Sequence, residues 1–251
     1  MLGRWPALPR VRPDGLTAHE GYLYVPSLSG LRVFDIRDPA NRQQVMVPEA
    51  PQNTRGPLVV AGNRAYTAGH GLSVLDVSAP ANPRMLGFLP VTEVSGNAIA
   101  VADQHVFILD AGSFFYPPGS TNPNPAGLHV VDVSDPAQPR KVSFLKTPPR
   151  YTPGYYTDFT DLIVSGGYAY AKLRNGVGSD IFDVRDPMKP TLVGNFPSYL
   201  LAVSGQRAYV SSSEGRLQIF DFSDPTNPVL LGTESTGSGG HDRMRLDSDL
   251  A

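Results

Sequence analysis

The chain has 251 residues and a formal net charge of −2, with 41% hydrophobic and 18% charged residues. This balance is typical of a folded protein and argues against nucleic acid or an acidic membrane surface as its partner. The absence of cysteine excludes disulfides, thiolate chemistry and cysteine-ligated zinc. No apolar run approaches the roughly 18 residues of a membrane span, so no transmembrane segment is expected.

The first residues predict no secretory leader. MLGRWPALPRVRPDG contains three prolines before residue 14 and has no apolar h-region, so no signal peptide is expected in the chain as given. A chain trimmed of its leader would look the same, and the compartment therefore stays open.

One short phrase occurs five times and sets the organisation of the chain. Each copy is an apolar run that ends at an Asp and is followed by a turn, usually Asp-Pro. The Asp of that turn can accept a hydrogen bond from the backbone two residues on, and the Pro fixes φ near −65°. The strand-ending Asp residues lie 41, 56, 51 and 38 residues apart, which gives a period near 40 with two insertions. The copies are LRVFDIRDPANR (31–42), LSVLDVSAPANP (72–83), LHVVDVSDPAQP (128–139), SDIFDVRDPMKP (179–190) and LQIFDFSDPTNP (217–228).

Each unit contains four predicted strands, a to d, and no segment has a helical apolar stripe. Strand a is expected at 16–19, 58–61, 99–102, 162–165 and 201–204. Strand b carries one aromatic residue at the same position of every unit: Tyr24, Tyr66, Phe107, Tyr170 and Tyr209. Strand c is the repeated phrase, and strand d follows it, for example at 84–89, 190–196 and 228–233. Four short strands with a period near 40 predict an all-β protein, a β-propeller of about five four-stranded blades.

Strand c supports the propeller over a single sandwich. In LRVFDI, Leu31 and Val33 point to one face of the sheet while Phe34 and Ile36 point to the other. A half-exposed sheet would alternate apolar with polar residues. Apolar residues on both faces are expected when each sheet is packed between two neighbouring blades.

GLHVVDVSDPAQP (127–139) and VSGQRAYV (203–210) resemble the LVIVD-repeat β-propeller family. The resemblance covers about 15–233, so residues 1–251 are expected to form one propeller domain with a tail at 234–251. It implies a bacterial or archaeal protein, usually secreted or at the cell surface, and no single activity. Such propellers commonly have seven blades. Either five blades close here with an N-terminal strand as a clasp, or the chain is part of a longer array.

Two stretched connections break the regular repeat. In a propeller the b–c loops and the links from strand d to the next strand a open on the same face. The b–c loop of unit 3 (111–127) and the d–a link into unit 4 (145–161) are long, rich in aromatic residues and expected beside each other. Loops of this length are uncommon unless they are functional or disordered. They predict a recognition surface for a protein or carbohydrate, or a plug of mutually packed rings, formed by Phe114, Phe115, Tyr116, Tyr155 and Tyr156.

Polar residues just before strand a are expected around the mouth of the channel. Asp158 and Asp161 stand beside the aromatic segment and, with Asp14 of unit 1, are the candidate catalytic carboxylates. Arg55, Asn97 and Tyr199 occupy the corresponding places in units 2, 3 and 5 as candidate ligand-binding residues. The alternative is that these carboxylates only bind turn amides.

Three hypotheses remain open from sequence. The first is a noncatalytic binding module that uses the face formed by 111–127 and 145–161. The second is a hydrolase or lyase acting on a carbohydrate-like substrate through the channel-mouth carboxylates. The third is a scaffold repeat of a larger surface protein. No cofactor and no metal are predicted, because the histidines have no ligand spacing and phosphate-binding motifs are missing.

Overall fold

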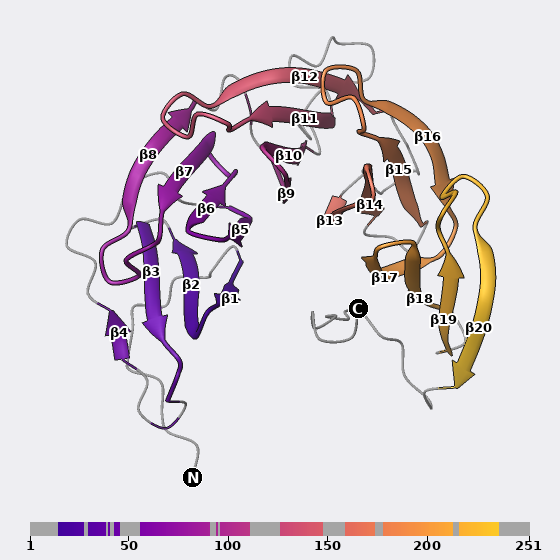
Figure 1. The fold of residues 1–251 in the computed structure, drawn as a ribbon, viewed down its shortest axis with the longest axis horizontal. Coiled ribbons are helices and arrows are strands. Elements are labelled where there is room, and N and C mark those ends of the chain that lie inside the picture. Colours follow the sequence, from indigo (N-terminus) through magenta and orange to yellow (C-terminus); the bar gives the residue numbers. More distant parts are fainter. Residues whose placement is uncertain are drawn as a thin grey trace, which may run out of the picture. The chain divides into compact units, whose positions relative to one another are not determined.

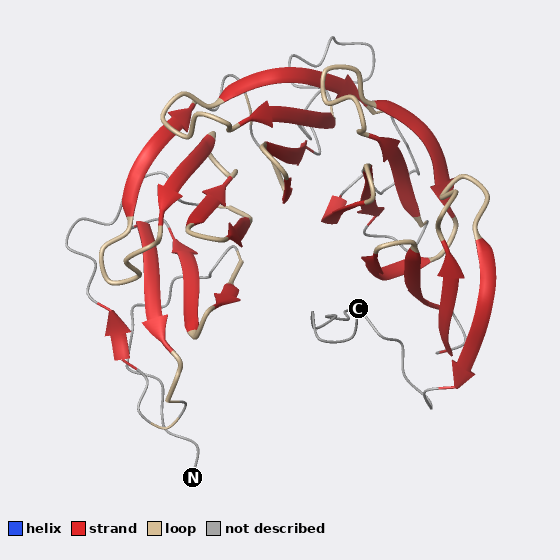
Figure 2. Cartoon of the chain, viewed as in Figure 1, coloured by secondary structure: helices blue, strands red, loops and turns tan. Residues whose placement is uncertain are grey.

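The structure is a computed structural model that describes residues 15–27, 30–38, 40, 43–45, 56–90, 94, 96–110, 126–147, 159–173, 178–212 and 216–235. These residues form strands and turns with no helix (Figure 2), so the all-β prediction is confirmed for them. In the same ranges there is accordingly no helix long and apolar enough to cross a membrane.

Twenty strands form five four-stranded sheets, which we number as blades 1 to 5 (Figure 1). In every blade the strands follow in chain order from a to d, as the sequence predicts. Blade 1 contains β1 (Thr17–His19), β2 (Tyr22–Ser27), β3 (Gly30–Asp35) and β4 (Gln43–Val45). Blade 2 contains β5 (Leu58–Ala61), β6 (Arg64–Thr67), β7 (Leu72–Asp76) and β8 (Arg84–Leu89). Blade 3 contains β9 (Ala98–Ala102), β10 (His105–Asp110), β11 (Gly127–Asp132) and β12 (Arg140–Lys146). Blade 4 contains β13 (Phe159–Ser165), β14 (Tyr168–Leu173), β15 (Ser179–Asp183) and β16 (Thr191–Phe196). Blade 5 contains β17 (Tyr199–Ser204), β18 (Arg207–Ser211), β19 (Arg216–Asp221) and β20 (Val229–Ser235).

The chain comprises two compact units. Unit 1 consists of residues 1–110 with 129–142, and unit 2 of residues 111–128 with 143–251. Within unit 1 the inner strands β1, β5 and β9 contact one another in sequence, and within unit 2 β13 contacts β17. Neighbouring blades of one unit thus meet through their first strands, as blades of a propeller do.

The core of each unit lies between its blades. The aromatic residue of strand b packs on the following blade: Tyr24 on Ala65 and Leu75, Tyr66 on residues of blade 3. In unit 2, Tyr170 lies 5.6 Å from the ring of Phe222 in blade 5. Burial raises the pKa of the Tyr170 hydroxyl. Apolar residues on both faces of strand c are buried, which confirms that the sheets are covered on both sides.

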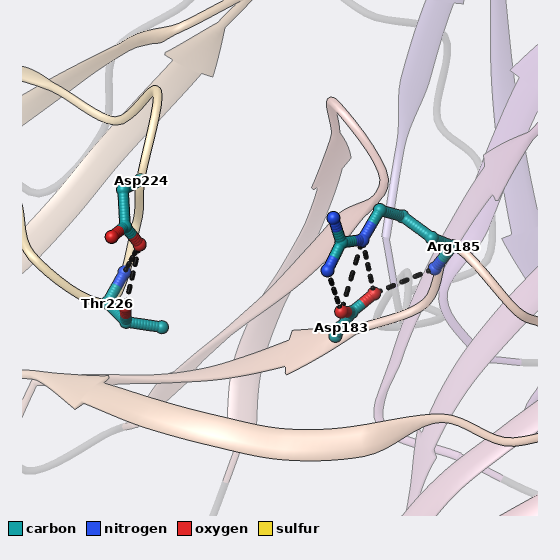
Figure 3. A network of polar contacts seen from close by, with 4 residues as sticks. All are labelled: Asp183, Arg185, Asp224 and Thr226. Atoms are coloured by element: carbon teal, nitrogen blue, oxygen red, sulfur yellow. Dashed lines mark hydrogen bonds and ion pairs between the residues drawn. The ribbon is translucent and has the colours of Figure 1, made fainter.

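The strand-ending Asp has the same structural task in all five blades. Its Oδ1 accepts a hydrogen bond of 2.8 to 3.0 Å from the backbone N–H two residues on. The Asp of the Asp-Pro turn does the same in four blades, at 2.9 to 3.0 Å. Figure 3 shows one of each, Asp183 with Arg185 and Asp224 with Thr226. These carboxylates are turn residues, as predicted from sequence.

Cations reach this Asp by three routes; in blade 3 it is Arg140, at the start of β12, that pairs with Asp132 over 3.1 Å. In blades 1 and 4, Arg37 and Arg185 stand two residues after the Asp and pair with it. Each of these guanidinium groups lies over the Tyr that opens strand b, about 5 Å from its ring centre. The Arg side chain also crosses a turn Gly, where an added Cβ would be 2.5 Å from the Arg Cγ.

In another route, a cation occupies the first position of strand b in place of that Tyr. In blades 2 and 5, hydrogen bonds from Ser78 and Ser223 lower the pKa of Asp76 and Asp221. In blade 2 the pKa is lowered further by Arg84, at the start of β8, and by Arg64, at the first position of strand b. In blade 5 it is lowered further by Arg207, also at the first position of strand b. A blade whose strand b opens with Tyr therefore has Asp-x-Arg at the end of strand c. A blade whose strand b opens with Arg has Asp-x-Ser there.

This arrangement predicts a loss of stability in acid. Hydrogen bonds from Arg37 lower the pKa of Asp35 to about 2, against about 3.9 in an unfolded chain. Because the folded pKa is the lower one, the stabilisation is present above about pH 4 and disappears as pH falls through 2. Asp35→Asn should lower the urea midpoint at pH 7 and flatten its decline between pH 4 and 2. Asp103→Asn, in the turn between β9 and β10, is the control; equal pH profiles for the native chain and Asp35→Asn would contradict this reading.

Candidate functional site

Most of the predicted site residues lie outside the residues that the structure describes. Asn97 and Asp161 are described in full, and Tyr199 is described only as the first residue of β17. The others stay predictions: Phe114, Phe115, Tyr116, Tyr155, Tyr156, Asp158, Asp14 and Arg55. The distances between the three candidate carboxylates would test the hydrolase hypothesis. Of the three, only Asp161 lies within the described residues.

The ends of the two stretched segments are described, and they lie together in unit 2. Residue 126 ends the b–c loop of blade 3, and residue 147 begins the link into blade 4. The backbone N–H of Thr147 donates to the carbonyl of Ala126 over 3.0 Å. Next to this bond, a Cβ on Gly127 would stand 2.5 Å from the Leu145 carbonyl and from the Phe144 ring. The described ends of the two segments are thus hydrogen-bonded, and the prediction that the segments lie beside each other stays a prediction for 111–125 and 148–158, which lie outside the described residues.

Asn97 lies where the b–c loop of blade 3 begins. Its side chain is exposed, and its backbone N–H donates to the carbonyl of Leu109 at the end of β10 over 2.7 Å. The preceding Gly96 donates to Ala68 of blade 2 over 2.8 Å, and a Cβ there would meet Ile108 at 2.3 Å. A tight backbone thus holds Asn97 beside the end of β10.

Asp161 lies on β13, where the segment 145–161 enters blade 4. The pairing of β13 with β14 shifts between Phe159 and Asp161, a β-bulge that changes the direction of the side chains. Phe159 is buried, whereas Asp161 is exposed and accepts the N–H of Leu162 at 3.0 Å through Oδ1. Asp161 is therefore held at the first strand of blade 4 with its carboxylate open to solvent.

Two residues beside Asp161 were missed from sequence. Lys172 on β14 is directly opposite Asp161, and Ser179 on β15 is directly opposite Lys172. Lys172 is only 5% exposed and Ser179 is fully buried. The signal was present in the repeat, because strand c of this unit begins with Ser where the four other copies begin with Leu.

A second carboxylate of blade 4, this one buried, has a structural role. Asp180 on β15 is 1% exposed, and Asn195 on β16 donates to it through Nδ2 over 3.1 Å. The same Nδ2 atom donates to the backbone carbonyl of Ser179 over 3.1 Å. Asn195 thereby joins β16 to β15 and satisfies Asp180 within the sheet.

The described residues contain no group of three His, Cys, Asp or Glu side chains placed to hold a metal ion. The buried histidine of this part of the chain is His129 on β11. Burial, with Lys141 nearby, lowers its pKa to about 4, so the imidazole is neutral at pH 7 and is part of the blade interior.

Five antiparallel sheets of four strands, with strand a of one blade against strand a of the next within each unit, define a β-propeller. Residues 56–89, 124–147, 158–197 and 200–236 match the LVIVD repeat and make up more than half of the chain. The chain belongs to the LVIVD repeat family. A search of curated proteins gives no significant match.

Solved structures share the fold at low sequence identity. The computationally designed Ika8 protein is 12% identical, with a TM-score of 0.58, and the match covers 93% of this chain and 64% of that one. A protein from Lactobacillus plantarum is 17% identical, with a TM-score of 0.51, and the match covers 89% of this chain and 71% of that one. A putative 6-phosphogluconolactonase from Bacteroides fragilis is 11% identical, with a TM-score of 0.55, covering 84% and 64% respectively. At these identities the likeness is one of fold only.

Proposed function

We propose that this protein is a noncatalytic binding module that takes a carbohydrate or a protein on the face formed by 111–127 and 145–161. The observation that carries the proposal is the hydrogen bond between Thr147 and Ala126. It joins the bases of the two segments that depart most from the blade repeat. Binding residues commonly lie on loops that a rigid scaffold positions, and here blades 3 and 4 supply that scaffold.

The composition of the two segments supports recognition by aromatic side chains. Between them they carry seven Phe and Tyr residues among prolines. Aromatic rings stack on sugars and dominate the binding energy of protein interfaces. Asp161, where the segment 145–161 enters β13, adds an exposed hydrogen-bonding group.

The test is a double substitution in the aromatic segments. Phe115→Ala with Tyr156→Ala should lower binding at least about tenfold on arrays of glycans and of peptides. The control is Phe88→Ala with Leu231→Ala, which truncates two exposed apolar side chains on the outer strands β8 and β20. Both variants should unfold near the native temperature. The proposal fails if the native chain binds neither array, or if the double variant binds as the native chain does.

A further inference from the structure

A cavity of about 330 Å³ lies between blades 2 and 3, inside unit 1. It is formed by the turn between β5 and β6 and by the end of β9 with the turn that follows, and β5 and β9 contact each other. This volume is at the small end of the range for ligand sites. The cavity lies at the start of β10, whereas the b–c loop of blade 3 leaves from the end of that strand. The cavity therefore uses other residues than the loop face.

The cavity has a cause in the sequence of blade 2. In blades 1 and 4 strand b opens with Tyr22 and Tyr168, and each ring packs on the apolar cluster shared with the next blade. In blade 1 the guanidinium group of Arg37 lies over that ring. In blade 2 the first position of strand b is Arg64, and the residue that corresponds to Arg37 is Ser78. The space that a stacked Tyr and Arg fill in blade 1 is thus open between blades 2 and 3.

Arg64 brings a cation with unused donors to the cavity. Its Nη1 atom donates a long hydrogen bond of 3.5 Å to the carbonyl of Val133 in blade 3. Within the part of the chain that the structure describes, its other N–H groups have no hydrogen-bond partner. Asp76 is directly opposite Arg64 in the sheet. Hydrogen bonds from Ser78, and then the charges of Arg84 and Arg64, lower the pKa of the Asp76 carboxyl group. One carboxylate thus faces two guanidinium groups, which leaves a positive charge for a ligand.

Asp103 brings a carboxylate to the same cavity, in a backbone conformation that favours glycine. It follows β9 with a φ of 51°, in the left-handed region. The corresponding residues are Glu20 in blade 1 and Gly62, Gly166 and Gly205 in the others. Asp103 is exposed, and among the described residues no ion pair joins it to Arg64 or to another cation. Residues other than glycine in this conformation are concentrated at functional sites, which fits a carboxylate held ready for a ligand.

Apart from Asn63, the rest of the lining is apolar. Tyr66, which is 3% exposed, and the partly buried Val101 both belong to the apolar cluster of blades 2 and 3. Ala61 and Ala102, at the ends of β5 and β9, add small side chains to the lining. A mostly apolar lining with a few placed polar groups is usual for a small-molecule site. The cavity can therefore bury a short apolar group beside one cation and one anion.

We propose that this cavity binds a small zwitterionic amino acid, whose carboxylate pairs with Arg64 and whose ammonium group pairs with Asp103. This is a second site, and it does not depend on the loop face. A guanidinium group can donate two parallel N–H bonds to a carboxylate, and an ammonium group supplies the donors that a free carboxylate accepts. The ligand carries both charges because Asp103 repels an anion and Arg64 repels a cation. A short apolar side chain of the ligand covers Tyr66 and Val101.

The test titrates the full chain, labelled with nitrogen-15, with L-valine and with two analogues that each lack one charge. N-acetyl-L-valine has no ammonium group, and L-valinamide has no carboxylate. L-valine up to about 10 mM, which detects affinities into the millimolar range, should move the backbone amide resonances of 61–66 and 101–104 saturably. Each analogue should bind at least about tenfold more weakly, the effect of one lost charged hydrogen bond. The corresponding turn of blade 5, 204–207, is the internal control, and its resonances should not move.

Two variants remove the site and keep the blades. Asp103→Gly gives the turn the residue of three other blades, so it should fold and bind L-valine at least about tenfold more weakly. Glu20→Gly is the matched control, because it makes the same kind of change at the other non-glycine residue with positive φ, and it should bind as the native chain does. Asn63→Gly with Arg64→Tyr and Ser78→Arg gives blade 2 the residues of blade 4. This triple variant should fill the cavity and abolish binding.

The inference is overturned if L-valine moves no resonance of 61–66 or 101–104, or if either analogue binds as tightly as L-valine. It is also overturned if Asp103→Gly keeps native affinity for L-valine, or if the triple variant folds and still binds it. Should the triple variant not fold, Asp103→Gly decides alone. Recognition by the loop face is read separately, on the arrays with the Phe115 and Tyr156 variant, and none of these results bears on it.

Discussion

Tyr66→Ala should cost about 3 to 5 kcal/mol of unfolding free energy, the range for removing a large buried ring from a core. Tyr66 is 3% exposed and packs on Val74 of its own blade and on Val106 and Ile108 of blade 3. The substitution leaves a cavity between two blades, and the rigid sheets on either side can only partly collapse into it. The loss is measured as a lower urea midpoint at an unchanged m-value.

The repeat provides a matched control for this change. Tyr209 occupies the same position in blade 5, but it is half-buried and no following blade of unit 2 covers it within the described residues. Tyr209→Ala should therefore cost less than about 2 kcal/mol, because less apolar surface is lost. Equal losses for the two substitutions would contradict the view that the strand-b aromatic stabilises the chain by packing on the next blade.

Gly87→Ala should cost about 1 to 3 kcal/mol, the range for overpacking a close contact. Gly87 lies on β8, and a Cβ there would be 2.2 Å from the carbonyl oxygen of Pro136, in the c–d turn of blade 3. Because that atom belongs to the backbone, it cannot move aside as a flexible side chain would. Blade 3 has Ser143 at this position, and its Oγ donates to the Pro187 carbonyl of blade 4 over 2.7 Å. The outer strand thus contacts the Pro carbonyl of the next blade's turn.

Gly194 on β16 is the control for Gly87. It has the same place in blade 4, yet an added Cβ would meet nothing within 4 Å. Gly194→Ala should be neutral or stabilising by up to about 1 kcal/mol, because it restricts the unfolded chain without a clash. Differential scanning calorimetry of the two variants gives the comparison, and a larger loss for Gly194→Ala would refute the assigned contact.

The fold could be predicted from sequence because the same local chemistry occurs five times. The strand-ending Asp and the Asp-Pro turn have a local cause, and the structure assigns them the turn roles that the sequence predicts. The strand-b aromatic recurs in the sequence, but its packing on the next blade is seen only in the structure. The routes by which a cation reaches the strand-c Asp were not anticipated. In blades 1 and 4 the route includes contacts between residues about 15 apart, Tyr22 with Arg37 and Tyr168 with Arg185, which no single-position pattern indicates.

The candidate site was predictable only in outline. Loop length and aromatic content indicated which sector departs from the repeat, and the bond between Thr147 and Ala126 joins the two segments there. Lys172 was overlooked because a single Lys in a strand usually indicates an exposed face. Its burial follows from the register of β13, β14 and β15, which the bulge after Phe159 sets, and a bulge cannot be located from one sequence.

The central claim is that ligand recognition lies where blades 3 and 4 depart from the repeat. Hydrogen–deuterium exchange of the native chain, with and without the best-bound glycan or peptide of the arrays, tests it most directly. We expect added protection in peptides covering 96–110, 126–147 and 159–173, with the outer strands β8 and β20 unchanged. Protection confined to blades 1, 2 or 5, with none in those three ranges, would contradict the claim.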